Sequence, residues 1–349
     1  MLDYLPTVGL ALVMGLTLTL PFSVRRVEQE LEAFLLVMGL TAVSLSNVWS
    51  VYLVRESLVE PLKITAAVAG VGWVFRAVRS RLKGWLSFLI ARLGLSGAVF
   101  TIVVVLGLGS GVLTAIVAAT ILAELVTLLK LDRKFEIQLT VYACYAIGLG
   151  AALTPIGEPL ATLVVAKLKG QPHDAGFWYL MRHIGVWVAP GVLAAAALAA
   201  RGTRAAVAGS RGLSESGHET SRDILLRALR VYAFVMALIF LGAGLRPLAE
   251  RFVAKMPTWA LFWANSISAI VDNATLVAAE VTPAMTDRQI TFVLMGLLIS
   301  GGMLIPGNIP NIISAGKLHI KSGEWAGAAL PFGAVLMLVY FVLMSLLVQ

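Results

Sequence analysis

Residues 261–282 read LFWANSISAIVDNATLVAAEVT, a stretch about as long as one membrane-spanning helix. The stretch is mostly apolar, yet Asp272, Asn273 and Thr275 lie near its centre. An ionisable side chain inside a membrane segment costs about 3 kcal/mol unless a partner compensates it, so it indicates a functional site by default. The alternative is that Asp272 only caps a helix in a buried turn. We favour the functional interpretation because a similar stretch occurs earlier in the chain.

The composition indicates an integral membrane protein. The chain has 349 residues, of which 59% are hydrophobic and 13% are charged, and its mean hydropathy is +0.90. A soluble domain of this size does not need so many apolar runs, so we expect an all-α, multi-pass protein of a cell membrane. The net charge of +8 fits contact with anionic lipid headgroups, and no nucleic-acid-binding motif accompanies it. The single cysteine, Cys144, allows no intrachain disulfide bond.

The apolar runs predict about nine full spans and two re-entrant hairpins. Single spans are expected at residues 5–22, 31–54, 64–78, 85–106, 177–200, 224–245 and 325–348. A short loop that contains Pro61 is expected at residues 55–63, and the only long polar stretch, residues 201–223, is expected to be a flexible linker. These boundaries predict a scaffold at residues 1–83, a first repeat at residues 84–200 and a second repeat at residues 224–349.

Hairpins and broken helices are expected at matching places in the two repeats. The glycines of residues 107–111 are expected to end a helix, so that residues 112–129 form the first hairpin with its tip near residues 118–120. The second hairpin is expected at residues 259–282. Two further segments, residues 135–168 and 290–318, are too long for one span, and prolines interrupt each of them. We therefore expect broken helices whose freed carbonyl groups face a site, because lipid cannot satisfy them.

The two repeats also correspond residue by residue. TAIVAA, which begins at Thr114, matches SAIVDN, which begins at Ser268, and GAALTP from Gly150 matches GGMLIP from Gly301. A re-entrant hairpin does not cross the membrane, so each repeat crosses an odd number of times and the second enters from the opposite side. Such inverted repeats are typical of secondary transporters, whose sites lie where broken helices meet. The alternative is a chance similarity between apolar segments, which the matched Pro and Gly positions disfavour.

Three motifs resemble a known group of transporters: ISAIVDNATL at residues 267–276, TPIGEPL at residues 154–160 and IPGNIPNIISAGKLHIKS at residues 305–322. Together they resemble the prokaryotic predicted cation transporter family of the ion-transporter superfamily. The Asp-Asn pair is similar to one in sodium/proton antiporters of the D type, and arsenite permeases and dicarboxylate transporters are more distant. The resemblance covers nearly the whole chain. It implies two hairpins and two broken helices around one site, in a homodimer with a scaffold and a moving transport unit.

The hairpin tips favour a cation as the substrate. The dicarboxylate relatives carry Ser-Asn-Thr at both tips, whereas residues 118–120 read Ala-Ala-Thr and the second tip carries Asp272. A fixed acid disfavours a dianion, and hard cations take oxygen ligands from carboxylate, amide, hydroxyl and carbonyl groups. The expected cation- and proton-binding residues are Asp272, Asn273, Thr275, Asn308, Asn311, Thr154 and Glu158, with sodium at Asp272 and Asn273.

Several of these residues have a structural alternative of comparable weight. Asn308 and Asn311 are equally suited to satisfying the backbone of the broken helix. Glu158 is equally suited to capping the helix that follows its break, where a carboxylate is favourable. Glu124 and Glu280 are candidate proton relays, but anchoring at the membrane interface is the interpretation that we favour for them.

These observations predict a cation/proton antiporter, most simply for sodium. A carboxyl group removed from water favours its protonated form, and an arriving cation would expel that proton from Asp272. The alternative is a sodium-coupled symporter or exporter of a small anion, bound at half-helix N-termini. We expect no enzyme and no cofactor, because Asp272 is the only aspartate in an apolar run and no His-Glu-x-x-His motif is present. His183 is the one pH-sensing candidate among the histidines, and the even distribution of Lys and Arg leaves the orientation open.

Overall fold

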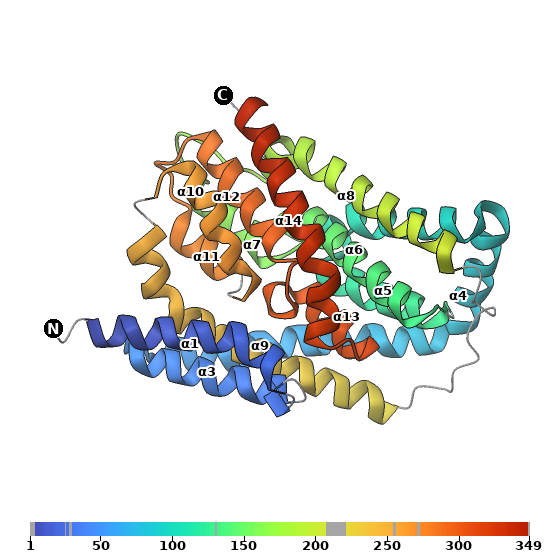
Figure 1. Ribbon diagram of the computed structural model, residues 1–349, viewed down its shortest axis with the longest axis horizontal. Helices are drawn as coiled ribbons and strands as arrows, with labels where there is room; N and C mark the ends of the chain where they lie inside the picture. Colours follow the sequence, from blue (N-terminus) through green and yellow to red (C-terminus); the bar gives the residue numbers. More distant parts are fainter. Residues whose placement is uncertain are drawn as a thin grey trace.

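The structure, a computed structural model, describes residues 4–24, 26–27, 30–129, 131–206, 221–253, 256–270 and 273–347. Within these residues every regular element is a helix (Figure 1). The described part contains four helical segments long and apolar enough to cross a membrane, at Gly84–Leu113, Tyr179–Thr203, Ala228–Leu248 and Ser322–Leu347. Asp272 lies outside the described residues, and so does the side chain of Thr275. The fold is therefore that of an all-helical membrane protein.

The helices follow one another with short connections. In chain order they are α1 (Tyr4–Ser23), α3 (Leu31–Ser46), α4 (Val51–Leu113), α5 (Ala115–Leu128), α6 (Arg133–Ala151), α7 (Pro159–Lys167), α8 (Tyr179–Ala206), α9 (Ser221–Val253), α10 (Thr258–Ala264), η1 (Asn265–Ala269), α11 (Asn273–Glu280), α12 (Asp287–Ser300), η2 (Ile305–Gly307), α13 (Ile309–Leu318) and α14 (Ser322–Leu347). Several of them are too short to cross a bilayer alone, among them α5, α7, α10, α11, α12 and α13.

The N-terminal helices form one side of the molecule. Helices α1 and α3 lie beside α9, and the first half of α4 also packs on α9 (Figure 1). The predicted loop at residues 55–63 and the separate span at residues 64–78 are wrong, because α4 continues through Pro61. The chain instead changes direction at Gly94, whose φ of 68° is one that glycine adopts at little cost. The expected span at residues 31–54 is also shorter, because Asn47 ends α3 in a left-handed conformation.

The predicted tip of the first hairpin is wrong. Residues 118–120 lie inside the continuous helix α5, and the chain breaks at Thr114, whose φ is 72° and whose Oγ1 accepts the Val117 N–H at 3.3 Å. The glycines of residues 107–111 do not end α4. They let α4 approach α6 closely, since a Cβ on Gly150 would collide with the Gly107 carbonyl oxygen. Small residues at a membrane helix contact commonly have this role.

The two broken helices are present at the predicted places. Helix α6 ends at Ala151 before α7 begins, and α12 ends at Ser300 before η2 and α13. Pro159 is the first residue of α7, and Pro310 lies in the first turn of α13. The prolines therefore start the second half of each broken helix, where no N–H is needed, rather than removing a hydrogen bond from its middle. The carbonyl groups of the breaks come from the preceding connections.

The second hairpin, defined as α10, η1 and α11, has two short arms as predicted. Its first arm continues from α10 into η1, and its second arm is α11. The linker is shorter than predicted, because residues 201–206 extend α8 and residues 221–223 begin α9, while residues 207–220 lie outside the described part.

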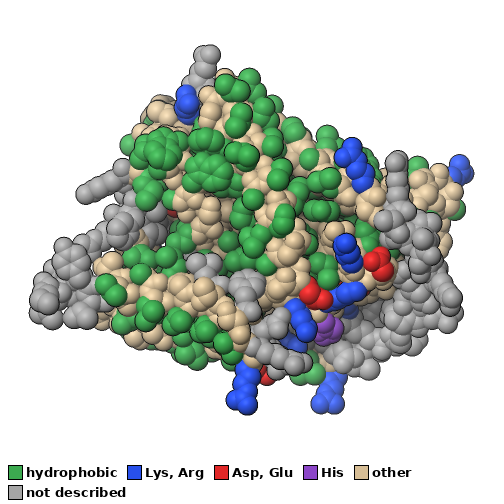
Figure 2. Space-filling view, in the orientation of Figure 1, with side chains coloured by type: hydrophobic (Ala, Val, Ile, Leu, Met, Phe, Trp, Pro, Cys, Tyr) green, Lys and Arg blue, Asp and Glu red, His purple; other side chains and the backbone are tan. Residues whose placement is uncertain are grey.

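The broken helices occupy the interior, and apolar side chains cover much of the outside. Helix α12 is buried from Ile290 to Ser300, and α6 is buried along most of its length. Figure 2 shows hydrophobic side chains over a broad part of the surface, with most of the charged groups gathered near one edge. On α14, Val335, Leu338 and Leu346 are exposed. Such an apolar exterior is suited to contact with lipid acyl chains.

Candidate functional site

Two buried serines connect the second hairpin to the end of α12. The Ser300 hydroxyl group lies 2.6 Å from the carbonyl oxygen of Asn265 and 3.2 Å from the Ser268 hydroxyl oxygen. The Ser268 hydroxyl group donates to Asn273 Oδ1 or, at 3.0 Å, to the Leu297 carbonyl oxygen. Asn273 begins α11, so these contacts place its carboxamide beside the end of α12. The Asn273 Nδ2 is buried and has no acceptor among the described residues.

Backbone carbonyl groups converge beside this carboxamide. A Cβ on Gly307 would lie 2.5 Å from the Gly301 oxygen, 2.8 Å from the Ser268 oxygen and 2.9 Å from the Ala269 oxygen. The oxygens come from the second hairpin and from the second break, so they meet only in the folded chain. Gly301 also contacts Asn273, because a Cβ there would lie 2.7 Å from Asn273 Nδ2. We call this group of backbone oxygens, from Gly301, Ser268 and Ala269 around Gly307, the carbonyl cradle.

Asn311 borders the carbonyl cradle from α13. Its Nδ2 donates to the carbonyl oxygens of Gly301 and Leu304, each at 2.9 Å. The side chain therefore satisfies the backbone of the broken helix, as one of the two interpretations predicted. Its Oδ1 is buried and has no donor among the described residues. Asn311 thus combines a structural contact with an acceptor that remains available for a ligand.

The first break is held differently. The Thr154 hydroxyl group donates to the Gly111 carbonyl oxygen, and the Gly157 carbonyl oxygen accepts the Ala115 N–H at 2.8 Å. Glu158 is buried at the N-cap position of α7, but its side chain makes no capping hydrogen bond. Glu158 thus occupies the N-cap position that the capping interpretation predicted, although no capping hydrogen bond from its side chain is formed. The Thr154 side chain therefore joins the start of the first break to the end of α4.

A family model described as a protein of unknown function (DUF1646) matches residues 7–347. The chain belongs to this family. The match includes both breaks, the second hairpin and the N-terminal helices, so the carbonyl cradle lies inside the DUF1646 region. A comparison with curated proteins gave no match. The family description specifies no substrate, so the function must be argued from the site.

Asn308 occupies the N-cap of α13 in this DUF1646 protein, as Glu158 occupies the N-cap of α7. Its side chain makes no capping hydrogen bond and instead faces α6, where a Cβ on Gly148 would lie 2.6 Å from Asn308 Nδ2. Cys144 lies one turn earlier on α6 and is buried, and its Sγ contacts the Pro310 carbonyl oxygen at 3.5 Å. The second break therefore crosses α6 at Asn308.

The two glutamates proposed as relays have different surroundings. Glu124 on α5 forms an ion pair of 2.9 Å with Lys317 on α13, and both side chains are about nine-tenths buried. Glu280 ends α11 and is buried as well. Neither residue is exposed as an interfacial anchor would be, so the interpretation that we favoured from the sequence is wrong for both. The buried pair fixes α5 against α13.

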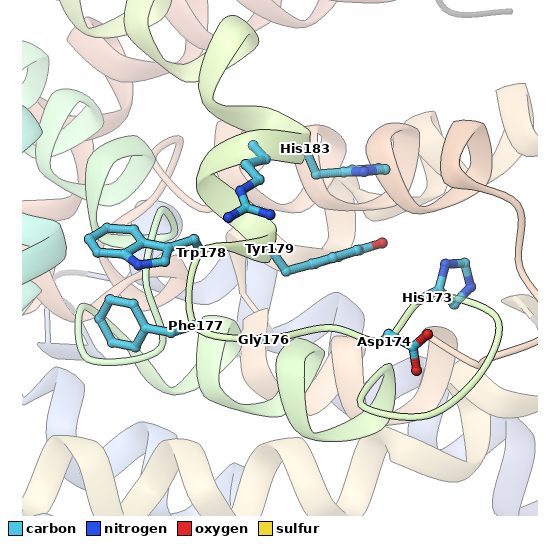
Figure 3. Close-up of a pocket in the computed structure, with 8 residues that line it drawn as sticks. His173, Asp174, Gly176, Phe177, Trp178, Tyr179 and His183 are labelled. Atoms are coloured by element: carbon cyan, nitrogen blue, oxygen red, sulfur yellow. The ribbon is translucent and has the colours of Figure 1, made fainter.

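An open pocket of about 360 Å³ lies apart from the carbonyl cradle, and none of the cradle residues lines it. Figure 3 shows its walls, in which the rings of Tyr179 and His183 lie nearly parallel and His173 approaches from the preceding loop. His173 Nδ1 lies 3.2 Å from an Asp287 carboxylate oxygen, and His183 Nε2 lies 3.1 Å from the Asp287 carbonyl oxygen. His173, in the loop before α8, and His183, in the first part of α8, therefore both contact the start of α12. Sequence analysis selected His183 alone and missed the contact of His173.

Sequence analysis also missed Ser268, Ser300 and Gly307 as members of the site. Ser268 could have been selected from the sequence, because it aligns with Thr114, the residue at which the chain breaks before α5. Ser300 and Gly307 carry no comparable signal. Their role depends on contacts with the second hairpin, which is distant in the sequence.

Asn311 and Asn308 should respond differently to truncation. Asn311→Ala removes the donor for two buried carbonyl oxygens, so we expect the free energy of unfolding to fall by about 2 kcal/mol or more. Asn308→Ala is the matched control, because the Asn308 side chain forms no hydrogen bond within the described part of the chain. Thermal unfolding of the purified variants in detergent measures the difference. Equal unfolding temperatures would show that the two Asn311 contacts do not hold the break.

Proposed function

We propose that the protein is a secondary active transporter that exchanges a monovalent cation, sodium in the simplest case, for protons. The observation that carries the proposal is the carbonyl cradle, in which oxygens of the second hairpin and the second break meet beside Asn273 and Asn311. Oxygen atoms of carbonyl, carboxamide and hydroxyl groups are the ligands that hard cations prefer. A cradle inside a membrane protein, away from its surface pocket, suits an ion that must shed its water to bind.

Inverted repeats at residues 84–200 and 224–349 are part of this proposal. Two reciprocal contacts support them, because α5 packs on α13 while α11 packs on α7. Each contact pairs a hairpin helix of one half with the second part of a broken helix of the other half. Two repeats related by an inverted two-fold axis would form such reciprocal helix contacts. A single site would then lie between the two repeats. We further propose a homodimer in a prokaryotic cell membrane, with residues 1–83 as the scaffold.

Asp272 supplies the charge in the proposed mechanism. It directly precedes Asn273, whose carboxamide borders the carbonyl cradle. In this mechanism the Asp272 carboxylate is neutralised by a proton or by a cation in each state that moves across the bilayer, because an uncompensated charge there is costly. Competition between the two for Asp272 then couples their movements in opposite directions. Thr275, Asn308 and Glu158 remain proposed members of the site, whereas the Thr154 side chain is engaged by Gly111.

A sodium-coupled transporter of a small anion is the second candidate function. Helices α7 and α13 begin at the two breaks, and neither is capped by a side-chain hydrogen bond. Uncapped helix N-termini bind anions, and the buried Asn273 Nδ2 is a further donor without an acceptor among the described residues. In this case the carbonyl cradle would hold the coupling sodium ion.

Flux measurements separate the two candidates. The purified full chain is reconstituted in liposomes that contain a pH-sensitive dye, and sodium, lithium, potassium or calcium is added outside in turn. We expect sodium to drive protons out of the liposomes without any added anion substrate. A proton flux for none of the cations, together with sodium-dependent uptake of a small anion, would reject the antiporter and support the second candidate.

A further inference from the structure

Glu280 is a buried acid that the carbonyl cradle does not use. It is the last residue of α11, and its side chain is 4% exposed. Neither of its carboxylate oxygens has a hydrogen-bond partner within the described residues. Acids in such surroundings are rare in folded proteins, because an ionised carboxylate without partners pays a large desolvation cost.

The Asn265 carboxamide, which lies beside Glu280, also has an unsatisfied polar atom. The Asn265 carboxamide, on the other arm of the second hairpin, interacts with the Glu280 carboxyl group at a geometry short of a standard hydrogen bond. Asn265 Nδ2 donates to the Val293 carbonyl oxygen at 3.2 Å, which leaves Asn265 Oδ1 buried without a donor in the described part of the chain. An acid and an acceptor without a donor thus lie together between the two arms.

The charged groups on the surrounding helices do not compensate Glu280. Lys167, at the end of α7, directs its Nζ to the Val281 carbonyl oxygen at 3.0 Å. Arg246 on α9 is exposed, and Asp287 at the start of α12 contacts His173. Among the described residues, none of these forms an ion pair with Glu280. The carboxyl group, which is buried and has no ion pair among the described residues, therefore fits its surroundings best when it carries a proton.

A line of polar contacts leads from Glu280 to the carbonyl cradle. Asn265 faces Glu280 with its side chain and accepts the Ser300 hydroxyl group with its backbone oxygen at 2.6 Å. Ser300 contacts Ser268 at 3.2 Å, and Ser268 donates to Asn273. Such a connected polar network in a low-dielectric interior transmits a change of charge more strongly than water would. A cation in the cradle would thus favour ionisation of Glu280.

We propose that Glu280 is a second proton-binding site, distinct from the carbonyl cradle, which moves a proton in addition to the one that the cation displaces from Asp272. The inference rests on the proposed cation/proton exchange. When the cation binds, it neutralises Asp272, the Glu280 O–H bond breaks, and the proton passes to water, so that the cation-bound state carries the negative charge of the Glu280 carboxylate. Exchange then moves more positive charge as protons than as cations, so it is electrogenic.

Proton release per bound cation tests this site in the full chain in detergent. Sodium binding is followed by calorimetry, and proton release is followed with a pH dye in the same weakly buffered sample. We expect Glu280→Gln to bind sodium and to release about half as many protons per cation as the wild type does. Glu30→Gln is the matched control, because Glu30 is exposed at the start of α3, and it should keep the wild-type ratio.

Two outcomes distinguish this inference from the function on which it rests. An unchanged ratio in Glu280→Gln would overturn the second proton site and leave the antiporter intact. A wild-type protein that releases no protons on addition of sodium would overturn both. If Glu280→Gln does not fold, the infrared band of a protonated carboxyl group in the wild type provides the test. That band should weaken on sodium binding, and its frequency should shift in Glu280→Asp. A band that changes neither on addition of sodium nor in Glu280→Asp would overturn the proposal.

Discussion

Replacement of Asp272 with asparagine is expected to abolish sodium-driven proton flux, with a loss of at least about 100-fold. Asparagine keeps the volume and the hydrogen-bonding capacity of the side chain but removes both the charge and the titration. The protein should still fold, because removal of a buried charge often leaves stability unchanged or improves it. The measurement is the liposome dye assay, with thermal unfolding in detergent to establish that the variant is folded.

Two matched variants sharpen the Asp272 prediction. Asp272→Glu should retain part of the flux with altered sodium affinity, because the carboxylate is kept but displaced by about 1.5 Å, the length of one carbon–carbon bond. Asp174→Asn should behave as the wild type, since Asp174 is exposed on the loop before α8. A wild-type rate in Asp272→Asn would refute the mechanism and direct attention to Glu158 and Glu280.

Gly307→Ala is expected to have an effect of similar size by a steric route. The added methyl group would meet three backbone oxygens of the carbonyl cradle at 2.5 to 2.9 Å, and backbone cannot rotate away as a side chain can. The hairpin and the break must then separate, which costs about 1–3 kcal/mol and disperses the oxygens. We expect sodium binding to be lost, as measured by calorimetry, with a moderate fall in unfolding temperature.

Gly316→Ala is the control for the steric argument. Gly316 lies on α13 as well, but a Cβ there would have no atom within 4 Å. Alanine also stabilises a helix interior by about 1 kcal/mol relative to glycine, so this variant should bind sodium normally and unfold no earlier than the wild type. Sodium binding by Gly307→Ala at wild-type affinity would show that the cradle is not the cation site.

The broken helices were predictable from the sequence because proline acts locally. Pro159 and Pro310 restrict their own φ angles and lack an N–H, so each suits the first turn of a helix better than its interior. The first hairpin was not predictable in the same way. Gly107 and Gly150 read as a signal for a helix break, yet their function is a close contact between α4 and α6. From the sequence alone, a glycine that ends a helix cannot be told from one that allows two helices to pack closely.

The site was predictable only where its residues carry an unusual chemistry for a membrane segment. Asn273 and Asn311 stood out as amides in apolar runs, and the structure brings both to Gly301. Ser300 did not stand out, because a serine hydroxyl group in a helix usually satisfies itself on the preceding turn. Ser300 does so with the Gly296 carbonyl oxygen at 2.7 Å, and only the folded chain adds its contacts to Asn265 and Ser268.

The ion pair between Glu124 and Lys317 constrains the order in which the protein assembles during its synthesis. Glu124 on α5 leaves the ribosome long before Lys317 on α13, and their 2.9 Å contact cannot form until both have been inserted. Placement of a charged residue in the membrane interior is costly without its partner. Helix α5 therefore takes its final position only after the C-terminal half has been made. A ribosome-bound chain that ends before α13 should leave α5 accessible to water-soluble reagents, although its whole sequence is already present.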